Sequence, residues 1–130
     1  MKQKEALEKQ KEFYNILVRW VSIHHKGRTI DQYFIEKGFK SIAIYGMSDL
    51  GELLYDELFD TNIEIKYVID QCHERVYAEV PVLSPEDELE KVDAIIITAV
   101  HYFEEISEVL IKKINCPMIS LDTVTYSLNY

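Results

Sequence analysis

The sequence predicts a three-layer αβα domain, in which a parallel sheet of about five strands lies between helices and follows two N-terminal helices. Short apolar runs bounded by turn residues predict strands buried on both faces, and apolar residues spaced three and four apart predict the helices between them. The chain has 130 residues, 48% of them hydrophobic, which suffices for one core. Within this single domain we distinguish an N-terminal helical segment, residues 1–38, from the α/β part, residues 39–130.

Two helices are predicted in the first 38 residues. Between residues 4 and 25, side chains recur at the spacing of three and four that is typical of one face of an amphipathic helix: Phe13, Ile16, Leu17, Trp20, Val21 and His24. Thr29 and Gln32 have the spacing of a capping box and predict the start of a second helix, which ends at Gly38. The apolar stripe of the first helix must pack on the α/β part or on another chain, so a homodimer through Phe13, Trp20 and Val21 is one alternative.

Strand and helix signals alternate from residue 41 to the end of the chain. Apolar runs predict strands at residues 41–45, 63–69, 80–83, 93–100 and 117–121, and apolar stripes predict helices at 50–58 and 103–114. Pro81 limits the third run to a sheet edge or to the end of a strand. Residues 84–87, Ser-Pro-Glu-Asp, have the cap, proline and acids of a short helix. This alternation implies parallel strands joined by right-handed crossovers.

Composition argues against several classes of function. There are 14 Lys and Arg against 23 Asp and Glu, so a net charge of -9 should repel nucleic acid and anionic membranes. No apolar run has the length of a signal peptide or a membrane span, and we expect a cytoplasmic protein. Cys72 and Cys116 are not spaced as a redox pair, and we expect reduced thiols. The pairs His24-His25 and Cys72-His73 lack a second pair at ligand spacing, so we expect no metal site.

A glycine turn lies between the first strand of the α/β part and the helix after it, which is the setting of a phosphate-binding turn. It consists of Gly46, Met47, Ser48, Asp49, Leu50 and Gly51. In the dinucleotide fingerprint the middle position is a glycine that lets pyrophosphate approach the backbone. Here Ser48 occupies it, and its hydroxyl could bind a phosphate at the helix N-terminus. The alternative is that both glycines serve only the turn and packing, while Ser48 or Asp49 caps the helix.

Two further strand ends would complete a crevice around this turn. Asp70, with Gln71 after it, lies roughly 20 residues beyond the turn, where an acid binds ribose hydroxyls in nucleotide-binding domains. The end of the most hydrophobic strand supplies Thr98, Ala99 and His101. His101 could bind a ligand or exchange a proton near neutral pH, although a histidine at a helix start is commonly only surface. We therefore expect the turn to face phosphates, Asp70 a ribose, and residues 98–101 the rest of a ligand.

Three stretches, 42–51, 67–70 and 93–98, together resemble the small Rossmann-like NAD(P)- or nucleotide-binding domains of bacterial capsular and surface polysaccharide biosynthesis proteins. Such relatives often have glycine in place of Ser48 and of Glu79. The resemblance implies a Rossmann fold, NAD(H) or a nucleotide-sugar as ligand, and a polysaccharide biosynthesis enzyme as partner.

These observations predict an accessory or regulatory nucleotide-binding domain. Its predicted site has no catalytic residue, because no nucleophile, base and orienting group occur together in the sequence. We therefore expect no activity of the chain alone. Two alternatives stay open at this point: the cofactor half of a sugar-nucleotide dehydrogenase or epimerase, and an interaction module that binds no ligand.

Overall fold

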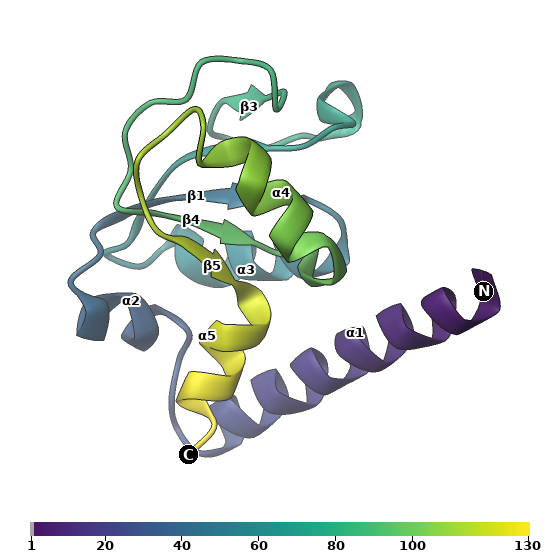
Figure 1. Ribbon diagram of the computed structural model, residues 1–130. Helices are drawn as coiled ribbons and strands as arrows, with labels where there is room; N and C mark the ends of the chain where they lie inside the picture. Colours follow the sequence, from purple (N-terminus) through teal and green to yellow (C-terminus); the bar gives the residue numbers. More distant parts are fainter. Residues whose placement is uncertain (1) are drawn as a thin grey trace.

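The computed structural model describes residues 2–130 and contains one five-stranded sheet, ordered β3-β2-β1-β4-β5 (Figure 1). Every neighbouring pair of strands is parallel. The strands are β1 Ser41–Tyr45, β2 Glu64–Ile69, β3 Val82–Leu83, β4 Ala94–Ile97 and β5 Met118–Ser120. The predicted fold class, a Rossmann-like three-layer arrangement, is confirmed. β3 is a two-residue edge strand directly after Pro81, as predicted.

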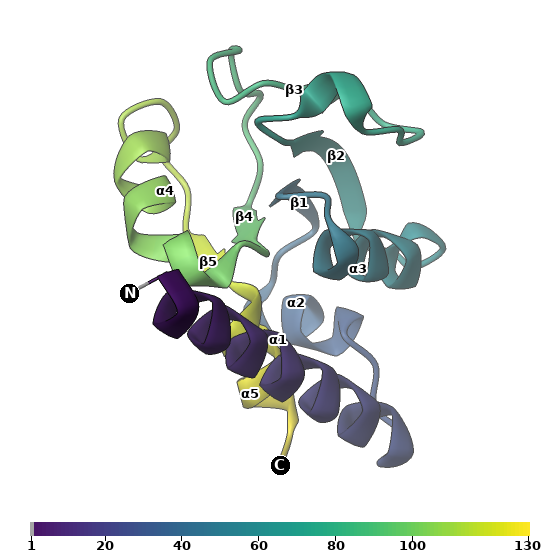
Figure 2. The ribbon, with the colours of Figure 1, turned by 90° about the vertical axis from the view of Figure 1, so that its right-hand side faces the viewer.

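Helices cover both faces of the sheet (Figure 2). They are α1 Lys2–His25, α2 Asp31–Lys37, α3 Asp49–Phe59, α4 Phe103–Leu110 and α5 Leu121–Leu128. Successive residues of a strand point to opposite faces. Ile42 and Ile44 of β1 accordingly join one core cluster with residues of α1, α2, α3 and α5. Ala43 and Tyr45 join a second cluster, which Leu110 of α4 completes on the other face.

The first helix packs on its own chain through a narrower stripe than the sequence predicts. Ile16, Trp20 and Ile23 are buried in the first core cluster, while Phe13 and Val21 are exposed. Trp20 Nε1 donates a hydrogen bond of 2.7 Å to Glu57 Oε1 of α3. Of the residues predicted for a homodimer contact, Trp20 is thus covered within the monomer, while Phe13 and Val21 are at the surface.

The second helix does not use the predicted capping box. The Thr29 hydroxyl donates to the carboxylate of Asp31 rather than pairing with Gln32, and α2 begins at Asp31. The amide of Ile30, just before the helix, instead donates to Glu57 Oε2 at 2.7 Å. A partner that lies distant in sequence thus replaces the local one.

The predicted helix after the third strand is wrong. Residues 84–93 contain only turns and irregular backbone, and Asp87 and Ser84 accept from nearby amides at 2.8 and 3.2 Å. The polar side chains that would cap a helix satisfy a local turn instead, and no apolar stripe follows that a helix could bury. The last helix, α5, was not predicted: Ser120 caps it by accepting from the Asp122 amide, and Val124 and Leu128 are buried.

Glu57 should be a main determinant of stability, because it accepts from both Trp20 and the start of α2. Replacement by alanine leaves two buried or half-buried donors without a partner. We expect Glu57→Ala to lower the free energy of unfolding by about 2–4 kcal/mol in urea denaturation. Glu52→Ala on the exposed side of the same helix is the control and should change it by less than about 0.5 kcal/mol. Equal effects of the two substitutions would contradict this role.

Candidate functional site

The candidate site lies at the carboxyl edge of the sheet, between β1 and β4. The chain leaves β1 toward β2 and β3 on one side and later leaves β4 toward β5 on the other. The helix after β1, α3, lies on one face of the sheet, and the helix after β4, α4, lies on the opposite face. Strand ends that diverge in this way form the crevice in which open α/β sheets bind ligands.

Both glycines of the turn after β1 are required by close packing. Gly46 has a φ of +95°, and a Cβ there would lie 2.7 Å from Thr98 Oγ1. A Cβ on Gly51 would lie 1.9 Å from the carbonyl oxygen of Gly46. The turn and the first turn of α3 therefore approach more closely than any side chain permits, whether or not a ligand is bound.

Thr98 fastens the end of β4 to this turn. Its buried hydroxyl lies within hydrogen-bond distance of two carbonyl oxygens, those of Tyr45 at 3.0 Å and Gly46 at 2.6 Å. The hydroxyl is the donor in these contacts, so its proton is already engaged with the backbone. Thr98 is thus a structural part of the crevice wall.

Asp70 fastens the end of β2 to the same turn. Its Oδ2 accepts from the amide of Met47 at 2.8 Å, and its Oδ1 accepts from the amide of Cys72 at 2.7 Å. Gln71 beside it is exposed, and burial raises the pKa of Tyr45 at the end of β1. The carboxylate of Asp70 is therefore oriented by two backbone donors.

The amino-terminal half of α1 covers the crevice, an arrangement that we did not predict from the sequence. The resulting cavity has a volume of about 270 Å³. From α1 it is lined by Lys9, Glu12 and Phe13, from the start of α3 by Ser48, Asp49 and Leu50, and from the end of β4 by residues 98–102. Six of the predicted site residues thus come together here: Ser48, Asp49, Leu50, Thr98, Ala99 and His101. The other five do not line this cavity: Gly46, Met47, Gly51, Asp70 and Gln71.

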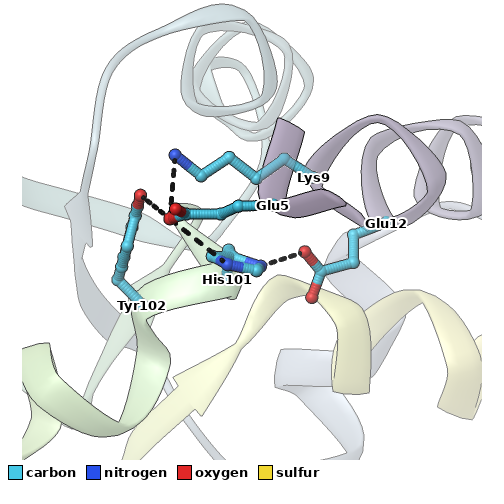
Figure 3. Close-up of polar contacts among 5 residues, drawn as sticks. All are labelled: Glu5, Lys9, Glu12, His101 and Tyr102. Atoms are coloured by element: carbon cyan, nitrogen blue, oxygen red, sulfur yellow. Dashed lines mark hydrogen bonds and ion pairs between the residues drawn. The ribbon is translucent and has the colours of Figure 1, made fainter. Parts of the chain in front are cut away.

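A polar cluster joins α1 to the crevice (Figure 3). His101 Nδ1 lies 2.7 Å from Glu12 Oε1, and its Nε2 lies 3.7 Å from Glu5 Oε1. The Tyr102 hydroxyl donates to Glu5 Oε1 at 2.9 Å. The Lys9 ammonium lies 4.6 Å from the centre of the Tyr102 ring. Three side chains of α1 and two that follow β4 therefore hold the cover in place.

The charges of this cluster depend on one another. The hydrogen bond from Tyr102, and then the charge of Lys9, hold the pKa of Glu5 below its ordinary value of 4.5. The hydrogen bond with Tyr102 likewise raises the pKa of Lys9. Both groups are therefore held in their charged forms at neutral pH.

The sequence did contain one signal for these contacts. Glu5, Lys9 and Glu12 continue, at spacings of four and three, the buried stripe of Ile16, Trp20 and Ile23 toward the start of α1. They are its polar extension, so they meet the rest of the domain on the same side of the helix.

The arrangement can bind a small polar ligand. The first amides of α3 have no partner within the helix, and the helix dipole adds positive potential there. The side chains of Lys9 and His101 are further donors, whereas Ser48 makes no cap hydrogen bond and keeps its hydroxyl available. Glu12 and Asp49 oppose this potential, which limits how much negative charge the cavity can accept.

A second hollow, of about 360 Å³, lies between α3 and residues 77–79. Its lining includes Met47 and four carboxylates, those of Glu52, Asp56, Asp60 and Glu79, and it has no cationic side chain. It is therefore a poor match for an anionic ligand.

Metal ligands, thiols and apolar helices define what other chemistry the described residues offer. Within residues 2–130 there is no group of three or more His, Cys, Asp and Glu side chains that could hold a metal ion. Cys72 and Cys116 are both free, and burial raises the pKa of the Cys116 thiol. None of the helices described is both long and apolar enough to span a bilayer.

Comparison of the chain with protein-family models, with curated proteins and with solved structures gave no significant match.

Gly46→Ala should destabilise the fold more than an alanine at another glycine of the same backbone conformation. Gly27 also has a positive φ, +76°, but a Cβ there meets nothing within 4 Å. Gly27→Ala should therefore lower the free energy of unfolding by about 1 kcal/mol, because alanine is strained at a positive φ. Gly46→Ala adds the clash with Thr98 and should lower the free energy of unfolding by about 3 kcal/mol or more. Urea denaturation compares the two variants, and equal losses would contradict the close packing of the turn.

Tyr102→Phe should raise the pKa of Glu5 toward its ordinary value, because it removes the largest cause of the lowered pKa. A carboxyl with a lowered pKa stabilises the fold above its unfolded-state pKa of 4.5, and this contribution is lost as the pH falls through the lowered value. Carboxyl NMR titration of the two proteins measures the change. Tyr14→Phe, on the exposed side of α1, is the control and should leave the pKa of Glu5 where it is. An unchanged titration in Tyr102→Phe would contradict the contact.

Proposed function

We propose that this chain is an accessory nucleotide-binding domain that places one nucleotide moiety in the crevice between β1 and β4. The observation that carries the proposal is the meeting of Ser48–Leu50, residues 98–102 and Lys9 around one cavity at the topological switch point of the sheet. A phosphate would bind the first amides of α3, and Lys9 and His101 would complete its hydrogen bonds.

The size of the crevice favours a mononucleotide or a nucleotide-sugar over NAD(H). The cavity of about 270 Å³ is just below the usual range of small-molecule sites, roughly 300–1,000 Å³. A dinucleotide carries a second nucleoside and would need α1 to move aside. The carboxylates of Glu12 and Asp49 oppose a pyrophosphate in NAD(H) and in a nucleotide-sugar alike.

The proposed biological setting is bacterial capsular or surface polysaccharide biosynthesis in the cytoplasm, where the domain would present the nucleotide to a partner enzyme. The support for this setting is the resemblance of residues 42–51, 67–70 and 93–98 to domains of such proteins. We propose no reaction for the chain alone, because the crevice combines donors and acceptors without a nucleophile beside a base.

A second candidate is an interaction module without a ligand. It is favoured by the cover itself, since the contacts of Glu5, Glu12, His101 and Tyr102 fill the mouth of the crevice with the chain's own side chains. In this case the polar cluster would serve only to dock α1, and no nucleotide would displace it.

Isothermal titration of the full chain with UDP-glucose and, separately, with NADH tests the proposal. We expect binding of UDP-glucose that is at least about tenfold tighter than that of NADH, a difference of about 1.4 kcal/mol. Ser48→Glu adds a negative charge at the start of α3 and should weaken UDP-glucose binding at least about tenfold. Ser127→Glu makes the same change on α5, away from the crevice, and should leave binding unchanged.

Two results would contradict this proposal. The absence of heat and of any thermal shift with both nucleotides would favour the interaction module. Binding that Ser48→Glu does not weaken would place the ligand elsewhere.

A further inference from the structure

The first helix carries a second apolar face, which the monomer leaves uncovered. Leu7, Tyr14, Val18 and Val21 are exposed by 53, 66, 49 and 56%. At 100° per residue they lie on the side of α1 opposite Ile16, Trp20 and Ile23, the stripe buried in the core. Figures 1 and 2 show α1 on the outside of the molecule. One side of the helix thus contacts its own domain, and the other presents apolar side chains to solvent.

The exposed side has the spacing of a coiled coil rather than of scattered surface residues. Together with three polar residues, these four side chains form an unbroken alternation of three and four: Lys4, Leu7, Lys11, Tyr14, Val18, Val21 and His25. A repeat of 3.5 residues keeps one seam of a helix against another helix along its whole length. α1 has 24 residues and is therefore about 36 Å long, so the seam extends over several turns.

We propose that this seam binds the same seam of a second copy of the chain, with the two α1 helices antiparallel. In this register Leu7 lies opposite Val18 of the second copy, and Lys11 lies opposite Tyr14 of the second copy. Lys4 at the start of one helix lies opposite Val21 of the other. The pairing is self-complementary, since each contact occurs twice about a two-fold axis.

Charge selects the antiparallel orientation. A parallel pair would place Lys4 on Lys4 and Lys11 on Lys11, which brings like charges together in the seam. In the antiparallel pair the lysines meet apolar and aromatic side chains, along which their stems can pack, and the ammonium of Lys11 can approach the face of a tyrosine ring.

This face differs from the one that the sequence suggested for a homodimer. Of Phe13, Trp20 and Val21, only Val21 belongs to the seam, because Trp20 is buried in its own chain and Phe13 lines the crevice. A second copy on the outer face would hold α1 from both sides, so dimerisation would stabilise the cover of the crevice. The inference does not depend on the identity of any ligand.

Sedimentation equilibrium of the full chain tests the association. We expect a particle of twice the 15.3 kDa chain mass. The double variant Tyr14→Glu with Val18→Glu should sediment as a monomer, because it buries carboxylates in the seam. The matched control introduces Val109→Glu with Ile111→Glu at comparably exposed apolar positions on and just after α4, and should stay dimeric. Circular dichroism of each protein checks that the fold persists.

Disulfide cross-linking in a Cys72→Ser background tests the orientation. A Leu7→Cys chain mixed with a Val18→Cys chain should give the mixed disulfide, whereas Leu7→Cys alone should give little. A wild-type monomer at the highest soluble concentration would overturn the proposal. So would a dimer that Tyr14→Glu with Val18→Glu leaves intact, and efficient cross-linking of Leu7→Cys to itself would overturn the antiparallel register.

Discussion

The turn after β1 leaves no room for a side chain at Gly46, and the geometry of the whole carboxyl edge depends on this constraint. Gly46, which has a positive φ, brings the turn against Thr98 at the end of β4. The hydroxyl of Thr98 contacts the carbonyl oxygens of residues 45 and 46. Asp70 at the end of β2 orients the next amide of the turn. Three strand ends are thereby fastened to one point, and α3 starts from it at a fixed angle. This close packing accounts for the glycines at positions 46 and 51 even if no ligand binds, and it also forms the walls of the crevice.

The second element of the site is α1, which lies outside the sheet and reaches the crevice only because other contacts hold it there. Glu57 of α3 accepts from Trp20 in the carboxyl-terminal third of α1 and from the backbone just before α2. Arg19 of α1 also pairs with Asp122 of α5 at 2.6 Å. Held in this part of the helix, α1 projects its first turns over the end of β4, where Glu5 and Glu12 meet His101 and Tyr102. The residues that cover the crevice therefore lie far from those that set their position.

The sheet could be predicted from the sequence because parallel strands buried on both faces form uninterrupted apolar runs, such as Ala94–Ile97. The orientation of α1 could not. Apolar residues occur on two opposite sides of this helix, so periodicity alone assigned Val21 to the buried stripe and omitted Ile23. Long-range contacts decide which side faces the core, among them those of Trp20 with Glu57 and of Arg19 with Asp122.

The two amino-terminal cap signals failed for a related reason, whereas Gly38 caps the end of α2 as predicted. The residues at Thr29 and at 84–87 have cap chemistry, but their hydrogen bonds are satisfied by Asp31 and by a closed turn. In the site, the positions that follow strand ends were predictable, because parallel strands end at one edge of the sheet. The partners from α1 were not, since Glu12 and His101 are 89 positions apart and no motif links them.

Backbone amide NMR of the labelled full chain during titration with UDP-glucose directly tests whether a nucleotide binds in the crevice between β1 and β4 beneath α1. We expect the largest shift changes on Ser48–Leu50, on Ala99–Tyr102 and on the α1 residues around Lys9 and Phe13. Shift changes confined to the hollow beside Tyr55 and Tyr77, or no changes at all, would contradict it.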